Sequence, residues 1–473
     1  MNELMGRLRA ALGPGAVLDG AEALAKAQGP FARTLGMPLA VLMPASTGDV
    51  STILRLCHAA HQPVVPWGGK TGLVDGCVAD DALALSLERM NRIEEIDARA
   101  ATMTVQAGCV LQTVCEAADA QGLFFPLDLG ARGSATIGGN IATNAGGNRV
   151  IRYGMTRDMV LGLEAVLADG TVLSSLNRLI KNNAGYDLKQ LFIGSEGTLG
   201  VVTRAVLRLR PRPISQNTAI AAVDGFDRLP RFLRHMERTL GGTLSAFEVM
   251  WEDFYKLVTT PPAKGRPPIP HGHPYYVLVE ALGGDQADDS ARFERALTAA
   301  LEGGDLADAA IAQSQAERDR MWGLRDDVIQ LARNFPIFLF DVSLGIGDME
   351  TYVAEIRRAL VARWPGASLV IFGHLGDGNL HVIVGVGDAG DAARHAVEAI
   401  VYGALRGRGG SISAEHGIGL EKRPFLDWSR GAEEIALMRS LKQALDPRNI
   451  LNPGKVLAPL AAAPSRDRHA TIL

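Results

Sequence analysis

The sequence predicts an α+β fold with two main domains. Its 473 residues exceed one ordinary domain, and two or three domains are expected at this length. From residue 37 to residue 213, short extended runs alternate with helical patterns, and beyond residue 213 both patterns mix again. Pro211-Arg-Pro213 is the expected boundary. We therefore expect an N-terminal helical extension over residues 1–36, a first domain over 37–213, a second domain over 214–456 and a small, polar, disordered tail over 457–473.

The first domain is expected to open with a strand in the apolar run 40–44. A helix capped near Ser46 or Thr47 should follow, because four apolar residues then recur at helical spacing, namely Val50, Ile53, Leu54 and Cys57. Residues 64–69 predict a strand that runs into a tight loop. Later strands are expected over residues 82–87, 102–107, 160–167, 200–203 and 206–209.

The second domain mixes helices and strands. Helices are expected over residues 229–240 and 290–301, and a strand over 275–282. The proline-rich stretch 261–270 must be a loop, because proline removes a backbone donor and excludes regular structure.

Composition excludes several classes of protein. Apolar residues make up 47% and charged residues 21%, with a net charge of -4 and no basic block, which argues against a nucleic-acid partner. Four cysteines without a C-x-x-C pair indicate reduced thiols in a cytoplasmic protein. The N-terminus lacks the apolar run of a signal peptide, and no apolar stretch is long enough to span a membrane. Peripheral membrane association stays open.

Two glycine clusters lie in the first domain, at 66–72 and at 137–147. Both present backbone N–H groups without side-chain shielding, which suits the pyrophosphate of a cofactor. The alternative is a pair of tight turns, but the second cluster is followed by a third glycine-rich stretch at 194–200, which favours a cofactor.

Two further glycine motifs are decoys. Gly69-Lys-Thr71 resembles the end of a Walker A loop, yet Val64 stands where that loop requires glycine. Residues 385–390 match G-x-G-x-x-G, but they follow one arm of an expected hairpin. We interpret them as a turn with Asp391 as the helix cap.

A candidate metal site lies in the second domain. Two apolar runs, 368–372 and 380–384, flank Gly-Asp-Gly-Asn, which predicts a hairpin that brings His374 and His381 together. Glu415 can add an oxygen ligand, and the open position left by three ligands suits a catalytic metal. His416 beside it is free to act as a base. The alternative for each histidine is a structural role in the core or in a loop.

Beyond these motifs, the chain resembles a known family over residues 37–456. The first-domain motifs are similar to the FAD domain of the vanillyl-alcohol oxidase/p-cresol methylhydroxylase superfamily: Pro66-x-Gly-Gly-x-Thr-Gly72, Ile137-Gly-Gly-Asn140, Asn144-Ala-Gly-Gly147, Tyr153-Gly154, Ala168-Asp-Gly170 and Gly194-Ser-Glu-Gly-Thr-Leu-Gly200. The later motifs resemble its D-lactate and D-2-hydroxyglutarate dehydrogenase branch: Trp322-x-x-Arg325, Phe340-Asp-Val-Ser-Leu344, Gly373–His381, Ala414-Glu-His-Gly417 and Leu445–Lys455.

The resemblance implies a two-part FAD-binding domain, a mixed α/β substrate (cap) domain and FAD between them. Lys70 stands where covalent members often carry a flavin-linked histidine, so non-covalent FAD is expected. The implied cofactor-binding residues are Pro66, Gly68, Gly69, Lys70, Thr71, Gly72, Leu73, Gly130, Ser134, Ile137, Gly138, Asn140, Thr143, Ala145, Gly146, Gly147, Glu196, Gly200, Val201 and, from the second domain, Asn452.

The resemblance also implies oxidation of a D-2-hydroxy acid. Zinc, with manganese and iron as alternatives, would be held by the histidine pair and Glu415, and His416 would be the general base. Arg325 would clamp the carboxylate and Trp322 would line the site; the alternatives are an ion pair with Asp326 or Asp327 and simple core packing.

Three positions depart from the D-2-hydroxyglutarate pattern. Ile329, Leu339 and Ile383 stand where those enzymes often have a polar, a basic and an amide side chain. Because an unpaired buried carboxylate is costly, we expect a substrate with a small or apolar side chain, such as D-lactate, a longer aliphatic D-2-hydroxy acid or D-mandelate.

Other functions remain as alternatives. These are a D-2-hydroxyglutarate dehydrogenase, a metal-dependent hydrolase, a sugar-oxidising or non-redox relative, and a flavin subunit of a larger complex such as a glycolate oxidase. A quinone, an electron-transfer flavoprotein or a cytochrome could accept the electrons, and a homodimer could form.

Overall fold

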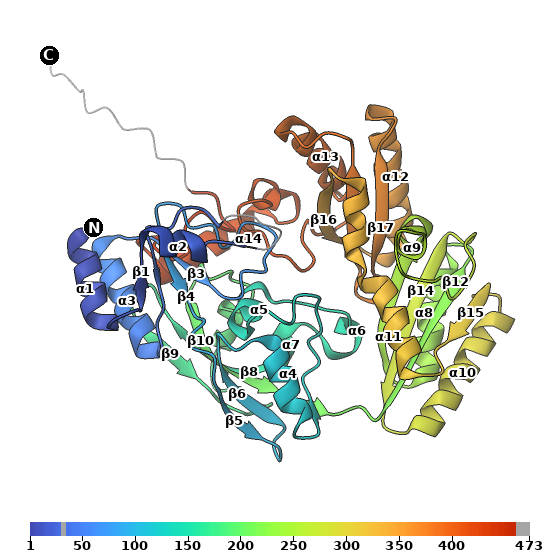
Figure 1. Cartoon of the computed structure of the whole chain (residues 1–473), viewed down its shortest axis with the longest axis horizontal. Helices are drawn as coiled ribbons and strands as arrows, with labels where there is room; N and C mark the ends of the chain where they lie inside the picture. Colours follow the sequence, from blue (N-terminus) through green and yellow to red (C-terminus); the bar gives the residue numbers. More distant parts are fainter. Residues whose placement is uncertain (30–34, 460–473) are drawn as a thin grey trace.

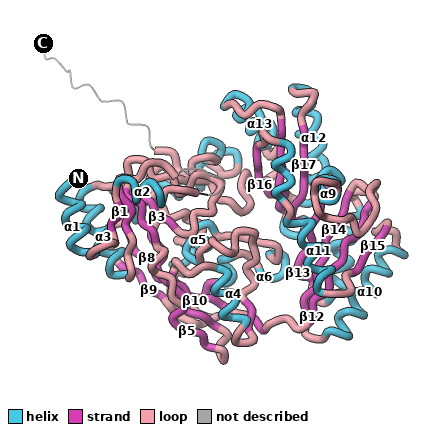
Figure 2. The backbone as a smooth tube through the Cα atoms, viewed as in Figure 1, coloured by secondary structure: helices cyan, strands magenta, loops and turns pink. Residues whose placement is uncertain are grey.

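The computed structural model describes residues 1–29 and 35–459. Two short helices stand in the expected N-terminal extension, α1 (Asn2–Leu12) and α2 (Gly20–Lys26). Most of the predicted tail lies outside the described residues. Mixed helices and sheets, matching the predicted α+β class, make up the rest of the chain (Figures 1 and 2).

The N-terminal half contains two larger sheets. One has the order β1-β2-β4-β3, with β2, β4 and β3 parallel, and comprises Val17–Leu18, Ala40–Leu42, Leu83–Ser86 and Val64–Trp67. The other is antiparallel, with the order β5-β6-β10-β8-β9, and comprises Ile93–Asp97, Thr102–Gln106, Val201–Arg208, Val160–Val166 and Val172–Ser175. The two strands predicted at 200–203 and 206–209 are therefore one strand, β10. A small pair joins β7 (Leu123–Phe124) to β11 (Arg210–Pro211).

Helices and short turns connect the strands of this half. The helix predicted after Ser46 is α3 (Thr47–Ala60), whose first turn is capped by the Ser46 hydroxyl, which accepts a hydrogen bond from the N–H of Asp49. The expected apolar stripe of α3 is buried. The remaining elements are α4 (Leu111–Asp119), α5 (Ile137–Thr143), α6 (Val150–Tyr153), α7 (Thr156–Met159) and the 3-10 turn η2 (Leu188–Leu191).

The second half is built on a seven-stranded antiparallel sheet with the order β15-β12-β14-β13-β17-β18-β16. Its strands are β12 (Ser215–Val223), β13 (Leu244–Trp251), β14 (Tyr275–Gly283), β15 (Asp308–Ile311), β16 (Phe338–Ser343), β17 (Ser368–His374) and β18 (Asn379–Gly385). The predicted hairpin is β17–β18, and the strand expected at 275–282 is β14.

Helices cover both faces of this sheet. The larger apolar core lies under α8 (Arg228–Leu240), α10 (Gln286–Glu302), α12 (Met349–Arg363) and α13 (Asp391–Gly403). The opposite face packs against α9 (Glu252–Thr259), α11 (Gln315–Asp326) and the 3-10 helix η3 (Val328–Asn334). Two short 3-10 turns, η4 (Ile346–Asp348) and η5 (Leu375–Asp377), precede α12 and β18. One expectation needs correction: Gly390, not Asp391, caps α13, and Asp391 is its first helical residue.

The C-terminal segment returns to the first half of the chain. After η6 (Arg423–Trp428), α14 (Ala432–Leu445) lies beside the N-terminal elements and away from α12 and α13 (Figure 1). Leu451 forms a parallel bridge with Val64 of β3, and Lys442 donates a hydrogen bond to the carbonyl of Thr198. Asn452 is thereby carried to the glycine-rich half, where it donates to the carbonyls of Gly76 and Glu196, and the flavin contact expected of it stays a prediction.

Candidate functional site

One face of the seven-stranded sheet carries a row of charged and imidazole side chains. On five adjacent strands, β14, β13, β17, β18 and β16, alternation places one charged or imidazole side chain each on the face that packs against α9 and α11: Glu280, Glu248, His374, His381 and Asp341. Glu248 is the cross-strand partner of His374, and Asp341 is the partner of His381. Since an unpaired buried charge is costly, the members of this row must be paired with one another or with other groups.

The predicted metal ligands meet at this row. One atom each of His374, His381 and Glu415 lies within 4.8 Å of the others, and these three candidate ligands are called the metal group below. The two imidazole rings are 5.4 Å apart between centroids, and Nε2 of His374 lies 3.6 Å from a Glu415 oxygen. Burial holds the pKa of His381 well below its usual value, which favours the neutral ring that a metal ligand requires. The donor set therefore fits a divalent metal.

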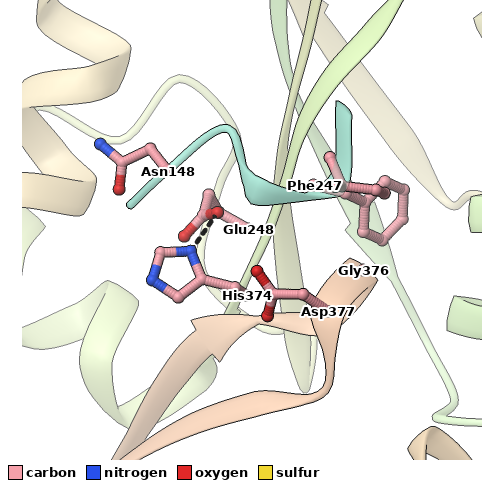
Figure 3. A pocket seen from close by; sticks show the side chains of 7 residues that line it. Asn148, Phe247, Glu248, His374, Gly376 and Asp377 are labelled. Carbon is pink, nitrogen blue, oxygen red and sulfur yellow. Dashed lines mark hydrogen bonds and ion pairs between the residues drawn. The ribbon is translucent and has the colours of Figure 1, made fainter. Parts of the chain in front are cut away.

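Glu248 orients His374, the first of the three candidate ligands. Its Oε1 lies 2.7 Å from Nδ1 of His374, as Figure 3 shows, and its Oε2 accepts a 2.8 Å hydrogen bond from Nε of Arg325. This contact turns Nε2 of His374 toward the metal group, which is the arrangement in which an outer carboxylate orients a metal-binding imidazole. Burial lowers the pKa of His374, but the Glu248 carboxylate outweighs burial and raises it to about 9.

Arg325 lies in the same cluster. The side chain is buried, stacks 4.9 Å from the Phe372 ring and places Nη2 3.1 Å from Nε2 of His374. Its close partner is Glu248, whereas Asp326 is 3.9 Å away. The guanidinium edge is therefore directed at the metal group, where a substrate carboxylate could accept its hydrogen bonds.

Asp341 orients the candidate base. Its Oδ1 lies 3.2 Å from Nδ1 of His416 and accepts a hydrogen bond from the buried ammonium of Lys422. Burial raises the pKa of Asp341, yet the nearby His416 and Lys422 hold it well below its usual range. With Nδ1 held, Nε2 of His416 is the ring nitrogen left for proton transfer.

The predicted cofactor residues gather in the other half. The first glycine cluster packs closely against the second and the residues that lead into it: a methyl group at Gly68 would lie 3.4 Å from Cα of Gly139, and one at Gly69 would lie 2.0 Å from the Ser134 carbonyl oxygen. Buried polar atoms without a hydrogen-bond partner among the described residues include Nδ2 of Asn140 and Oδ1 of Asn452. Such orphaned atoms fit a bound polar ligand, and FAD in this region would supply partners.

Two predicted cofactor residues point elsewhere. The Lys70 ammonium donates to the carbonyl of Lys26 and lies 5.5 Å from the centre of the Trp67 ring. Both carboxylate oxygens of Glu196 accept backbone hydrogen bonds from residues 418 and 419.

The two halves meet at the site. A methyl group at Gly146, in the second glycine cluster, would lie 3.4 Å from Oε1 of Glu415. Arg149 forms an ion pair with Glu280, with Nε 2.9 Å from Oε1, across the same boundary. Trp322 also donates to Glu280, at 3.1 Å, so it borders the interface. The metal group therefore faces the half that carries the glycine clusters.

The three predicted specificity positions differ in exposure. Ile383 is buried in the apolar cluster on the site face, and Leu339 is its cross-strand neighbour, 47% exposed. Ile329 is 75% exposed on η3.

Sequence reasoning missed the carboxylates that support the site. Glu248, Glu280 and Asp341 are each the only charged residue of a mainly apolar strand, and all three are 0–1% exposed. A single carboxylate within a strand that is otherwise apolar is a signal that could have marked them, because such a group must find a buried partner.

Comparisons with known proteins agree with this geometry. Residues 38–175 match the FAD binding domain family, and residues 212–456 match the C-terminal domain of the FAD linked oxidases. The fold is similar to that of p-cresol methylhydroxylase, with a TM-score of 0.77 and 16% identity over 97% of both chains. It is also similar to that of alkyldihydroxyacetonephosphate synthase, with a TM-score of 0.73 and 17% identity over 96% of this chain and 86% of the other.

Three curated relatives are closer in sequence. D-2-hydroxyglutarate dehydrogenase of Xanthomonas citri pv. viticola is 44% identical over 89% of both chains. The mitochondrial D-2-hydroxyglutarate dehydrogenase of Bos taurus is 40% identical over 94% of this chain and 81% of its own. A putative mitochondrial D-lactate dehydrogenase of Schizosaccharomyces pombe is 38% identical over 88% of this chain and 81% of its own.

The fold and the matched domains define an FAD-dependent oxidoreductase of the FAD linked oxidase class. The chain belongs to the vanillyl-alcohol oxidase/p-cresol methylhydroxylase flavoprotein family, in its D-2-hydroxyacid dehydrogenase branch. Among the described residues, no helix combines the length and apolarity needed to cross a bilayer.

Proposed function

We propose that this protein oxidises a D-2-hydroxy acid with a small or apolar side chain to the 2-oxo acid, using non-covalent FAD and a divalent metal, zinc first among the candidates. The observation that carries the proposal is the convergence of two imidazoles, one carboxylate and one guanidinium on a single sheet face beside the FAD-binding half. Manganese and iron can use the same ligands.

The cofactors supply two kinds of chemistry when bound. Bound FAD would supply a hydride acceptor for the C2 hydrogen, and a bound metal would supply the Lewis acidity that lowers the pKa of the 2-hydroxyl. His374, His381 and Glu415 would hold the metal, while Asn140 and Asn452 offer buried polar atoms to FAD.

The side chains of the site perform the remaining steps. Arg325 offers its guanidinium edge to the substrate carboxylate and fixes the orientation of C2. Nε2 of His416 accepts the hydroxyl proton as C2 loses its hydride, so the acid loses two electrons and two protons in all. Asp341 holds the ring through Nδ1 and stabilises the imidazolium that forms.

One of the three specificity positions, Ile383, supports the apolar substrate, because it is buried on the site face. A distal carboxylate placed against this side chain would lose hydration, and the aliphatic group offers no hydrogen bond in return. Leu339 and Ile329 are 47% and 75% exposed, so they add no desolvation cost. D-2-hydroxyglutarate is the second candidate, because the Xanthomonas and Bos relatives carry that name at 44% and 40% identity.

One titration tests both candidates. The anaerobic flavin spectrum of the purified holoenzyme is followed with D- and L-isomers of lactate, mandelate, 2-hydroxyvalerate and 2-hydroxyglutarate. The last two differ by a distal methyl or carboxylate, so they form a matched pair. We expect bleaching by D-isomers only, with 2-hydroxyvalerate preferred by about tenfold or more. A strong preference for D-2-hydroxyglutarate would overturn the apolar-substrate assignment, and a flavin that no hydroxy acid bleaches would overturn the reaction.

A further inference from the structure

The loop that carries Glu415 and His416 gives its backbone N–H groups to two protein carboxylates. Ala414, Glu415 and His416 donate to Oδ2 of Asp341 at 3.1, 2.7 and 3.1 Å. Further along the loop, residues 418 and 419 donate to Oε1 and Oε2 of Glu196 at 2.7 and 2.8 Å. Each of these N–H groups has a carboxylate oxygen as its partner, so the five hydrogen bonds together fix the path of the loop.

The two carboxylates come from the two halves of the chain. Asp341 lies on β16 of the seven-stranded sheet and is fully buried. Glu196 lies in the third glycine-rich stretch of the first half and is held in turn: its own N–H donates to the carbonyl of Ala142, and its carbonyl accepts from the Asn452 side chain. The loop therefore spans the boundary between the halves.

Glycine makes this close approach possible. Gly417 has a φ of +82°, and a methyl group there would lie 2.8 Å from Oε1 of Glu196. Gly419 has a φ of +52°, and a methyl group there would lie 1.9 Å from the carbonyl oxygen of Val74. Both positions combine a left-handed backbone with a contact that a larger residue would obstruct.

We propose that Glu196 is a positioning residue of the reaction, which places Glu415 and His416 against the flavin-binding half by holding the backbone of their loop. This inference rests on the proposed function. It also assigns the Glu196 carboxylate to the loop rather than to FAD. Asp341 sets the position of the same loop relative to the two histidine ligands, so the site is complete only when both halves hold it.

The test is the substitution Glu196→Gln in the full-length holoenzyme. The amide keeps the size of the side chain but turns an NH2 group toward one of the two loop N–H groups, so at least one hydrogen bond is lost. We expect faster hydrogen–deuterium exchange in the peptide that contains residues 414–419. Zn²⁺ affinity, measured by chelator competition, and the rate of flavin reduction at saturating substrate should each fall about 10- to 100-fold. FAD content should stay at the wild-type level.

Glu164→Gln is the matched control. Glu164 is a buried carboxylate of the same half and is 6% exposed. It accepts hydrogen bonds from Thr47 and Thr203, neither of which belongs to the loop. It should lower the thermal midpoint without changing Zn²⁺ affinity. Glu196→Asp keeps the charge, should restore part of the loss and replaces the glutamine variant if that protein does not fold.

Three outcomes overturn the inference. Loss of FAD with unchanged Zn²⁺ affinity would make Glu196 a cofactor contact. A fall in thermal midpoint alone, as in the control, would make it a structural residue. Wild-type rates and affinity despite faster exchange would show that the loop needs no such tether. Failure of the proposed function is distinguishable, because the wild-type protein itself would then bind no metal or reduce no flavin.

Discussion

The sheet face in the second half and the glycine clusters in the first half build their sites by opposite means. On the sheet face, chemistry is carried by side chains, and every charged member has a partner within hydrogen-bond distance, as with Glu248 between His374 and Arg325. In the glycine clusters the backbone itself is packed, and buried side-chain atoms such as Nδ2 of Asn140 are left without protein partners. A site made of paired side chains is pre-organised by the protein alone, whereas one made of packed loops leaves bonds for its ligand to complete.

The largest expected effect follows from removing a ligand on the sheet face. His374→Ala should lose the metal and lower turnover by about a thousandfold or more, since a bound metal would lower the activation barrier by several kcal/mol. FAD should be retained, because its expected contacts lie in the other half. Metal content by elemental analysis and steady-state turnover are the measurements. His235→Ala is the control, because His235 lies on α8 with Nε2 2.9 Å from the Ala296 carbonyl and is not one of the candidate metal ligands. Full metal content in His374→Ala would contradict the ligand assignment.

A smaller effect is expected from removing the base. His416→Ala should keep FAD and metal while flavin reduction slows by about a hundredfold or more, because proton transfer loses its acceptor. Stopped-flow absorbance of the flavin measures this rate directly. Reduction at the wild-type rate would exclude His416 as the base and leave the metal group intact.

The sequence predicted those parts of the site that are local. The histidine pair was predictable because a hairpin joins its two arms, and β17 and β18 pair as expected. Glu415 and His416 are consecutive in the sequence, so their proximity was also predictable. The helix α3 was predictable because its cap and its apolar stripe lie within one continuous stretch.

The supporting carboxylates were not predictable, because their partners are distant in the chain. Glu248 lies 126 residues from His374, and Glu196 lies 222 residues from Ile418, whose backbone N–H donates a hydrogen bond to it. The order of the strands was unpredictable for the same reason. Strand β13 lies between β14 and β17, although β17 is far away in the sequence, and no local pattern encodes that pairing. Glu196 illustrates the limit well, since its motif resembled a cofactor stretch while its carboxylate accepts hydrogen bonds from the loop that carries Glu415 and His416.

The smallest expected effect lies in the glycine clusters and compares two neighbouring residues. Gly69→Ala places a methyl group 2.0 Å from the Ser134 carbonyl oxygen, so one backbone must move, at a cost of about 1–3 kcal/mol. Gly72→Ala places its methyl group where no heavy atom lies within 4 Å. We expect the flavin-free Gly69→Ala protein to unfold at a lower temperature and flavin-free Gly72→Ala to unfold like the wild type.

FAD affinity then separates a packed backbone from a ligand surface. If the cofactor lies against Gly72, the methyl group meets FAD rather than protein, and FAD binding should weaken although the flavin-free fold is unchanged. Flavin fluorescence titration of the two flavin-free variants measures this difference. Equal FAD affinity in Gly72→Ala and the wild type would place the cofactor away from that loop. Loss of stability in the flavin-free Gly72→Ala protein would instead show that both glycines serve the packing of the loops.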